Sequence, residues 1–105
     1  MHDVSVNGLQ YVVIIAEQNK KKAFLSLLDE YEARGIESVY AHGSMSPSAV
    51  AAAFGFESEQ KKVMLSCLLK SKNAVQLMET LRKDHKFDMP NTGIAFSIPV
   101  EGMAF

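Results

Sequence analysis

Residue types that carry out chemistry are few in this 105-residue chain, and they are spread along it. The histidines, His2, His42 and His85, lie too far apart in sequence to suggest a preformed metal motif. Cys67 is the single cysteine and falls in an apolar run, which favours a small buried residue over a reactive thiol. Glu17 has no obvious acidic partner, and no Ser/His/Asp or Cys/His grouping stands out. The sequence therefore predicts a protein that is not an enzyme.

Clustered lysines are the remaining candidates for a site. Lys20, Lys21 and Lys22 crowd positive charge at the start of a predicted helix, where the helix dipole disfavours it. A solvated helix face is the ordinary explanation, and a site for an anion is the alternative. Lys61 and Lys62 stand at the start of a predicted strand. They either protect an exposed sheet edge or help to bind a phosphate.

Composition bounds the class of protein. Hydrophobic residues make up 48% and charged residues 22%, a balance typical of one globular domain, which we expect to span residues 1–105. The net charge of −1 argues against a nucleic-acid partner. No apolar run approaches the roughly 18 residues of a membrane helix, and no signal-peptide pattern is present. We therefore expect a cytoplasmic protein without a membrane span.

Hydrophobic periodicity predicts four strands and two helices. Apolar, partly β-branched runs indicate strands at 9–16, 36–44, 62–69 and 92–100. Helical spacing places two sets of residues on buried helix faces: Phe24, Leu27, Leu28 and Tyr31 in the first helix, and Ala74, Leu77, Met78 and Leu81 in the second.

The expected ends of these elements follow from their flanking residues. Asn19 is the predicted N-cap of the first helix and Gly35 the residue just past its end. Ser71 or Asn73 would cap the second helix. Pro99 marks the end of the last strand or an edge position, because it removes a ladder donor. The only two arginines, Arg34 and Arg82, fall within the predicted helices.

The order β-α-β-β-α-β predicts an α+β, ferredoxin-like fold, with a four-stranded antiparallel sheet and both helices on one face. The first and third strands are apolar on both sides, so the other sheet face must also be buried. A second copy of the chain is the economical cover, which predicts a homo-oligomer. A charge at Ile14 or Leu68 should then unfold or dissociate the protein.

The connection 44–60 is too long and too apolar for a tight hairpin. Its composition predicts a short helix over 48–54 that ends at Gly55. Such a short helix needs a contact, and Val50, Phe54 and Phe56 can provide one. They would pack either on a neighbouring subunit or on a protein partner.

The last strand resembles the closing strand of the nitrogen-regulatory PII signalling family, which runs from a glycine through an apolar strand to Pro-Val-Glu. The matching residues are Gly93, Ile94, Phe96, Ile98, Pro99, Val100 and Glu101. A second match is "ARGIESVYAHG", with Gly35, Ile36 and Gly43. The resemblance covers about residues 9–101. CutA-type trimers share the architecture, and "KDHKFDMP" is similar to their last helix exit, so they are the nearest competitor.

The resemblance to PII-like proteins implies a non-enzymatic signalling protein that forms a homotrimer around a threefold axis. It also implies that the loop 44–60 engages a protein partner, through Val50, Phe54 and Phe56. An adenine nucleotide would lie in the cleft between subunits, near the base of that loop and near "FDMPNTG", the loop before the last strand. The residues that correspond to this cleft are Gly43, Ser44, Lys62, Thr92 and Gly93.

Departures from the family's pattern weaken the phosphate side of this implied site. The loop contains no tyrosine to modify, and Ile94 stands where a phosphate-binding lysine would follow the glycine. No arginine follows the last strand. We therefore expect weak nucleotide binding with a preference for fewer phosphates. Two alternatives remain: a CutA-like structural or divalent-metal trimer, and a phosphoryl-transfer enzyme on the same fold.

Overall fold

The structure, a computed structural model of the whole chain, describes residues 8–40, 61–89 and 92–102. Its elements in chain order are β1 (Leu9–Glu17), the 3-10 turn η1 (Gln18–Lys20), α1 (Lys21–Glu30), β2 (Arg34–Tyr40), β3 (Lys62–Lys70), α3 (Ser71–Asp84) and β4 (Ile94–Pro99). Within the described residues, no helix is long and apolar enough to cross a bilayer. The predicted element order is confirmed.

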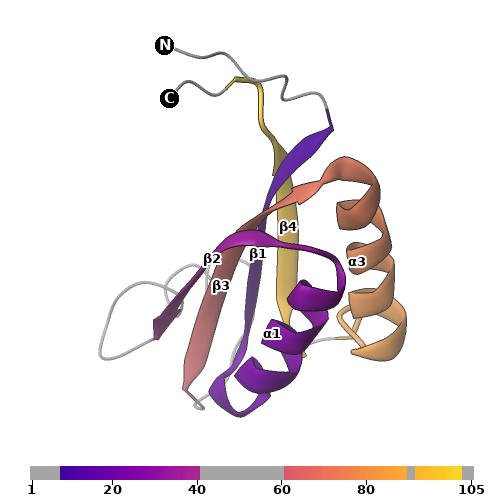
Figure 1. Cartoon of the computed structure of the whole chain (residues 1–105). Coiled ribbons are helices and arrows are strands. Elements are labelled where there is room, and N and C mark those ends of the chain that lie inside the picture. The colour runs from indigo at the N-terminus through magenta and orange to yellow at the C-terminus, as the bar shows by residue number, and fades with distance from the viewer. Residues whose placement is uncertain (1–7, 41–60, 90–91, 103–105) are drawn as a thin grey trace.

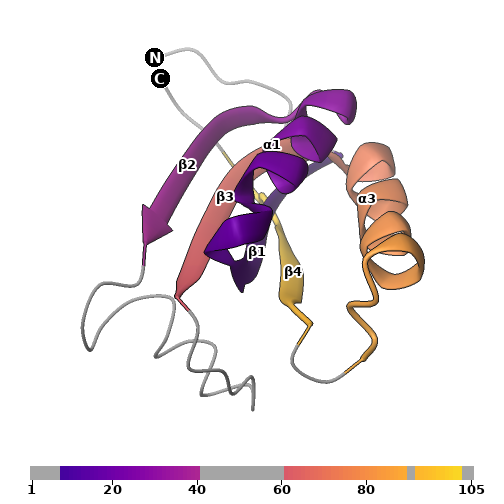
Figure 2. The ribbon, with the colours of Figure 1, turned by 90° about the horizontal axis from the view of Figure 1, so that it is seen from below.

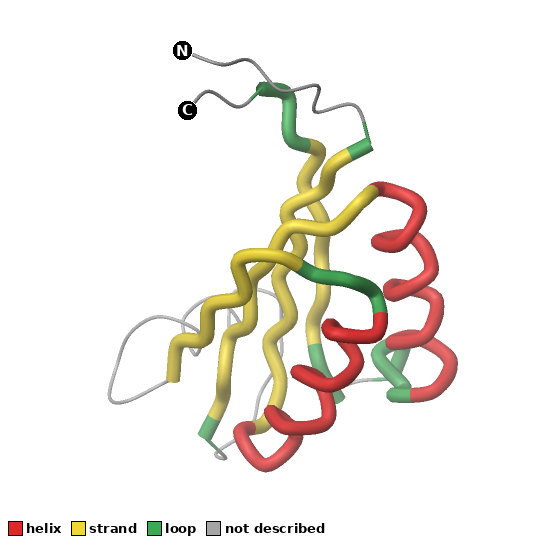
Figure 3. Tube along the Cα trace, viewed as in Figure 1, coloured by secondary structure: helices red, strands yellow, loops and turns green. Residues whose placement is uncertain are grey.

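The four strands form one antiparallel sheet in the order β2-β3-β1-β4 (Figure 2). Both helices lie on the same side of this sheet (Figures 1 and 3). The arrangement is the predicted ferredoxin-like α+β fold. It makes β2 and β4 the edge strands and places β3 and β1 at the centre.

The helix-covered face of the sheet carries the main core. Side chains of one parity on β1, such as Val12 and Ile14, are at most 1% exposed. They meet the apolar stripes of the two helices, represented by Leu28 and Leu77. Cys67 on β3 is also buried there, as predicted, and burial raises the pKa of its thiol to about 11. Each large side chain sealed in this way contributes roughly 1.5–3 kcal/mol of hydrophobic stabilisation.

The open face of the sheet carries a smaller apolar cluster. It centres on Val13 and Ile15, which pack with the partly buried Met64, Ile94 and Phe96. Around this cluster the same face leaves large apolar side chains in solvent: Tyr11 is 40%, Val39 38% and Ile98 50% exposed. The chain therefore completes one side of its sheet and leaves apolar surface on the other, as the sequence predicts.

Two helix boundaries differ from the predictions. Asn19 belongs to η1, and the residue that precedes α1 is Lys20, whose side chain makes no cap hydrogen bond. At the other end α1 stops at Glu30, and Glu32 takes the left-handed conformation expected for Gly35, with φ 62°. Gly35, with φ 60°, already lies inside β2. The prediction that Arg34 is helical is therefore wrong, because the chain turns into β2 earlier than expected.

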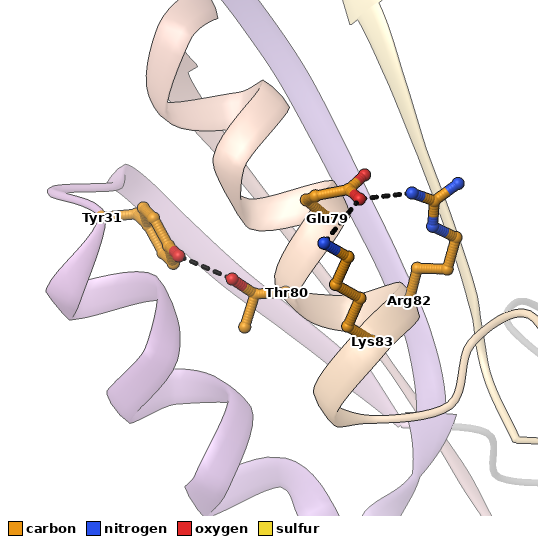
Figure 4. A network of polar contacts seen from close by, with 5 residues as sticks. All are labelled: Tyr31, Glu79, Thr80, Arg82 and Lys83. Carbon is orange, nitrogen blue, oxygen red and sulfur yellow. Dashed lines mark hydrogen bonds and ion pairs between the residues drawn. The ribbon is translucent and has the colours of Figure 1, made fainter.

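Hydrogen bonds tie the two helices to each other. The hydroxyls of Tyr31, just after α1, and Thr80 in α3 lie 2.7 Å apart (Figure 4). Asn73 donates from its amide to the carbonyl oxygen of Tyr31 at 3.1 Å instead of capping α3. Neither Ser71 nor Asn73 is the N-cap, because that position belongs to Lys70. The polar residues at the start of α3 thus position the helix against its neighbours.

Candidate functional site

The register of the strands brings three of the residues implied by the resemblance to one end of the sheet. Lys62 at the start of β3 stands opposite Glu17 at the end of β1. Ile94 at the start of β4 pairs with Ile15, two residues before Glu17. Gly93, which is buried, and the half-buried Thr92 precede Ile94 directly. We call this end the loop end of the sheet, because the chain enters and leaves the segment 41–60 there.

Lys62 is the cation of this end that the sequence singled out, and the structure changes its interpretation. The prediction that Lys62 protects an exposed sheet edge is wrong, because β3 is an inner strand and Lys62 is only 2% exposed. Burial lowers the pKa of its ammonium group, and the opposite charge of Glu17 acts in the other direction. Gln18 holds this strand start, donating from its side chain to the carbonyl oxygen of Lys62 at 3.1 Å and from its backbone to that of Lys61 at 3.0 Å.

The segment that leads from α3 to β4 is anchored by Phe87. Its backbone N–H donates to the carbonyl oxygen of Leu81 at 3.1 Å, and its ring meets the buried Phe24 edge-on, with centroids 5.6 Å apart. A Cβ atom added to Gly93 would overlap the Phe87 ring. The Phe87 ring therefore occupies the space that a side chain at position 93 would need, which accounts for the glycine there.

An open pocket of about 350 Å³ lies beside this aromatic contact, between the end of α3 and the start of β4. Its walls are mainly apolar, with Met78, Leu81, Phe87, Ile94 and Ala95. Gly93, Arg82 and Asp88 complete the lining. An apolar cleft with a few polar groups at its rim suits a flat, partly polar molecule.

The one cation of this lining is held by its own helix. Arg82 bonds through its guanidinium to the carboxylate of Glu79, and Lys83 lies 3.5 Å from the same carboxylate oxygen (Figure 4). The Arg82 hydrogen bond lowers the pKa of Glu79. A phosphate that approached this pocket would have to compete with Glu79 for Arg82. The pocket therefore offers little charge to a triphosphate.

The lysines at the start of α1 have a partner of their own. Lys21 Nζ lies 4.5 Å from the centroid of the Tyr40 ring and donates to the Tyr40 hydroxyl. A cation over an aromatic face is stabilised by the ring's quadrupole. Lys21 thereby links α1 to the last described residue of β2, next to the loop end of the sheet.

Several residues named from the sequence cannot be placed. Gly43, Ser44, Val50, Phe54 and Phe56 lie outside the described residues, as do His42 and the helix predicted over 48–54. Among the residues that the structure describes, no group of three His, Cys, Asp or Glu side chains could hold a metal ion. Sequence reasoning placed the ligand near the loop before the last strand but did not single out the pocket residues Phe87 and Asp88 in it. Their contribution depends on how the segment 85–93 folds back onto α3, which no local pattern encodes.

The sheet order and the two helices on one face define a protein with the ferredoxin-like fold, and solved structures of PII-like proteins share it. The apo form of CPII from Thiomonas intermedia, a nitrogen regulatory PII-like protein, superposes with a TM-score of 0.66 at 18% identity, covering 91% of this chain and 94% of CPII. CPII bound to ADP, AMP and acetate gives a TM-score of 0.63 at 20% identity, covering 85% of this chain and 82% of CPII.

A third structure, the GlnK–ATP complex of B. subtilis, gives a TM-score of 0.57 at 14% identity, covering 92% of this chain and 85% of GlnK. Neither the protein-family models nor the curated proteins give a match. At these identities the likeness establishes the fold. It confirms the fold that the PII-like resemblance implies, and it does not favour the CutA-type alternative.

Proposed function

We propose that this protein is a non-enzymatic regulator of the PII-like kind, at work in the cytoplasm as a homotrimer and built as one domain over residues 1–105. The observation that carries the proposal is the open face of the sheet, which exposes Tyr11, Val39 and Ile98 around a buried apolar cluster. An apolar surface of this kind is typical of an interface. Three copies arranged around one axis would bury the three faces against each other.

The ligand that we propose is an adenine nucleotide, bound weakly between subunits at the loop end of the sheet. Gly43, Ser44, Lys62, Thr92 and Gly93 would contribute, as the resemblance implies. Support comes from CPII, whose structure was determined with ADP and AMP, and from GlnK, determined with ATP. An adenine ring suits the apolar pocket beside Phe87.

We propose that this site favours AMP over ATP. Among the described lining residues Arg82 is the only cation, and it is engaged by Glu79. Lys62, the other candidate, is buried, and burial lowers the pKa of its ammonium group. Each added phosphate brings charge that these side chains neutralise poorly.

Calorimetric titration with AMP, ADP and ATP tests the ligand, with light scattering on the same sample to give the assembly. We expect trimers that bind AMP at least as tightly as ATP. Lys62→Met should weaken AMP binding, and Lys61→Met is the matched control one residue earlier. Much tighter binding of ATP would contradict the proposed preference. Trimers that bind none of the three nucleotides would leave the assembly standing and refute the ligand.

A protein partner completes the proposed role, because a regulator must pass its signal on. We propose that the segment 44–60, with Val50, Phe54 and Phe56, makes this contact. The described strands support this arrangement, since β2 and β3 deliver the segment to the same end of the sheet as Lys62 and Gly93. A ligand at that end would therefore lie close to the residues that meet the partner.

A further inference from the structure

A second pocket lies at the opposite end of the sheet from Lys62 and Gly93. It encloses about 230 Å³ where the start of β1, the start of β2 and the end of β3 meet the first turn of α3. Leu9, Leu68 and Leu69 supply its apolar walls. Nothing in the proposed nucleotide site uses this pocket, which is separated from it by the full length of the strands.

The pocket exists because β2 joins the sheet late. Arg34 pairs with Leu68, but the last two residues of β3, Leu69 and Lys70, have no partner on β2. The register also shifts between Arg34 and Glu37, at a bulge or similar irregularity. Irregularities of this kind redirect the side chains of a strand. A space remains beside the end of β3, and Arg34 stands at its rim.

Three charged side chains surround the leucine walls. Arg34 and Lys70 are positive and Glu32 is negative, and all three are exposed members of the lining. The ion pairs found within the described residues join Glu79 to Arg82 and Lys83, so none of the three is committed to one. The pocket thus combines two cations, one carboxylate and an apolar floor in a small volume.

We propose that this pocket binds a free α-amino acid with an apolar side chain. Arg34 and Lys70 would hold its carboxylate, for which the arginine fork is well suited. Glu32 would accept hydrogen bonds from its ammonium group, and Leu9, Leu68 and Leu69 would bury its side chain. The volume lies below the roughly 300–1,000 Å³ that drug-sized ligands occupy, which fits a ligand this small.

Other anions match the pocket less well. A phosphate or a nucleotide would gain from Arg34 and Lys70 but would be repelled by Glu32. A simple carboxylic acid would leave Glu32 without a partner. Only a zwitterion uses all three charges with the correct signs, and only an apolar side chain uses the leucines.

Titration of ¹⁵N-labelled full-length protein followed by NMR tests the proposal, with three probes of matched shape. They are L-leucine, 4-methylpentanoate, which lacks its amino group, and 3-methylbutylamine, which lacks its carboxylate. We expect saturable shifts at Glu32, Arg34 and 68–73 with L-leucine, and at least about tenfold weaker binding of the two analogues, because each loses a charged hydrogen-bonding group. Equal binding of all three probes, or no shifts at these residues, would overturn the proposal.

Variants of Arg34 and Glu32 test which residues bind the carboxylate and the ammonium group of the ligand. Arg34→Gln should weaken L-leucine binding about tenfold or more, while Lys83→Gln, a cation at the far end of α3, should leave it unchanged. Glu32→Gln should weaken L-leucine binding and strengthen that of 4-methylpentanoate, because a like charge is removed. The pocket would not be an amino-acid site if Glu32→Gln leaves the ranking of the probes unchanged, or if Lys83→Gln matches Arg34→Gln.

Discussion

The two faces of the sheet differ in how completely this chain covers them. On the helix side, Val12, Ile14 and Ala16 are at most 1% exposed, because α1 and α3 close over them. On the open side, Tyr11 and Ile98 remain 40% and 50% exposed although they lie in the same sheet. Hydrophobic side chains alternate to both faces of β1, yet the chain supplies a helical layer for one face only.

The same apolar pattern serves a different purpose on each face of the sheet. On the helix side it contributes to the free energy of folding of one chain. On the open side it is surface that a second molecule can bury, and there it would contribute to the proposed assembly. A charge placed on the helix side should therefore lower the free energy of unfolding of the single chain. A charge placed on the open side should instead weaken the proposed assembly.

The largest effect is expected for Ile14→Asp. This side chain is 1% exposed within the main core, so the variant would bury a charge with no partner among the core residues. We expect a loss of about 4–5 kcal/mol or more in the free energy of unfolding, enough to unfold a domain of this size. Circular dichroism during urea denaturation measures it. A cooperative transition at the midpoint of the unmodified protein would contradict the assignment of this face.

Ile98→Asp changes the open face instead. Half of this side chain is already in solvent in the single chain, so the fold should survive. The proposed trimer should not survive, because the charge would enter its interface. We expect a native-like circular dichroism spectrum together with a smaller particle in size-exclusion chromatography. Ser97→Asp, an exposed neighbour of opposite parity on β4, is the control that should retain the assembly. Equal behaviour of the two variants would show that the open face is not the interface.

Gly93→Val tests the contact at the loop end of the sheet. The new side chain would overlap the Phe87 ring, and overpacking of this kind costs about 1–3 kcal/mol. Thermal unfolding should show the loss. Adding Phe87→Leu should restore part of the stability, because the smaller side chain frees the space. A double variant that is less stable than the sum of the single changes would contradict this account of Gly93.

Tyr31→Phe should have a smaller effect within the helix layer. It removes the hydroxyl that lies 2.7 Å from Thr80 Oγ1, a hydrogen bond worth about 0.5–1.5 kcal/mol. A double-mutant cycle with Thr80→Val isolates the pair, since the second change should cost little once the first is made. Fully additive losses would show that the two hydroxyls do not interact.

The smallest expected effect is the contribution of Lys62 to the pH dependence of the free energy of unfolding. Its pKa is lower in the native state than the ordinary value of 10.5, so between these two pKa values the unfolded chain binds more protons. The free energy of unfolding should therefore rise with pH between the native-state and the unfolded-state pKa of Lys62. Below the native-state pKa, the destabilisation by the buried charge is fully present. Lys62→Met should flatten the rise, whereas Lys61→Met should keep it. A rise that persists in Lys62→Met would assign it to another group.

Much of the fold could be predicted from local patterns, because helical spacing at Phe24, Leu27 and Leu28 and apolar runs in the strands report burial directly. Strand order could not be read from Lys62, because a lysine at a strand start looks the same on an edge strand and on an inner one. The late start of β2 pairing and the approach of Phe87 to Gly93 arise from tertiary packing. Those are the features that shape both pockets.

The mass of the unmodified protein in solution shows whether other copies of the chain cover the open face of the sheet. Sedimentation equilibrium or light scattering over a range of concentrations gives that mass without any variant. If the open face is completed by other copies of the chain, the particle should weigh three times 11.6 kDa. A single species of 11.6 kDa at all concentrations would contradict the account, because the apolar open face would then remain uncovered.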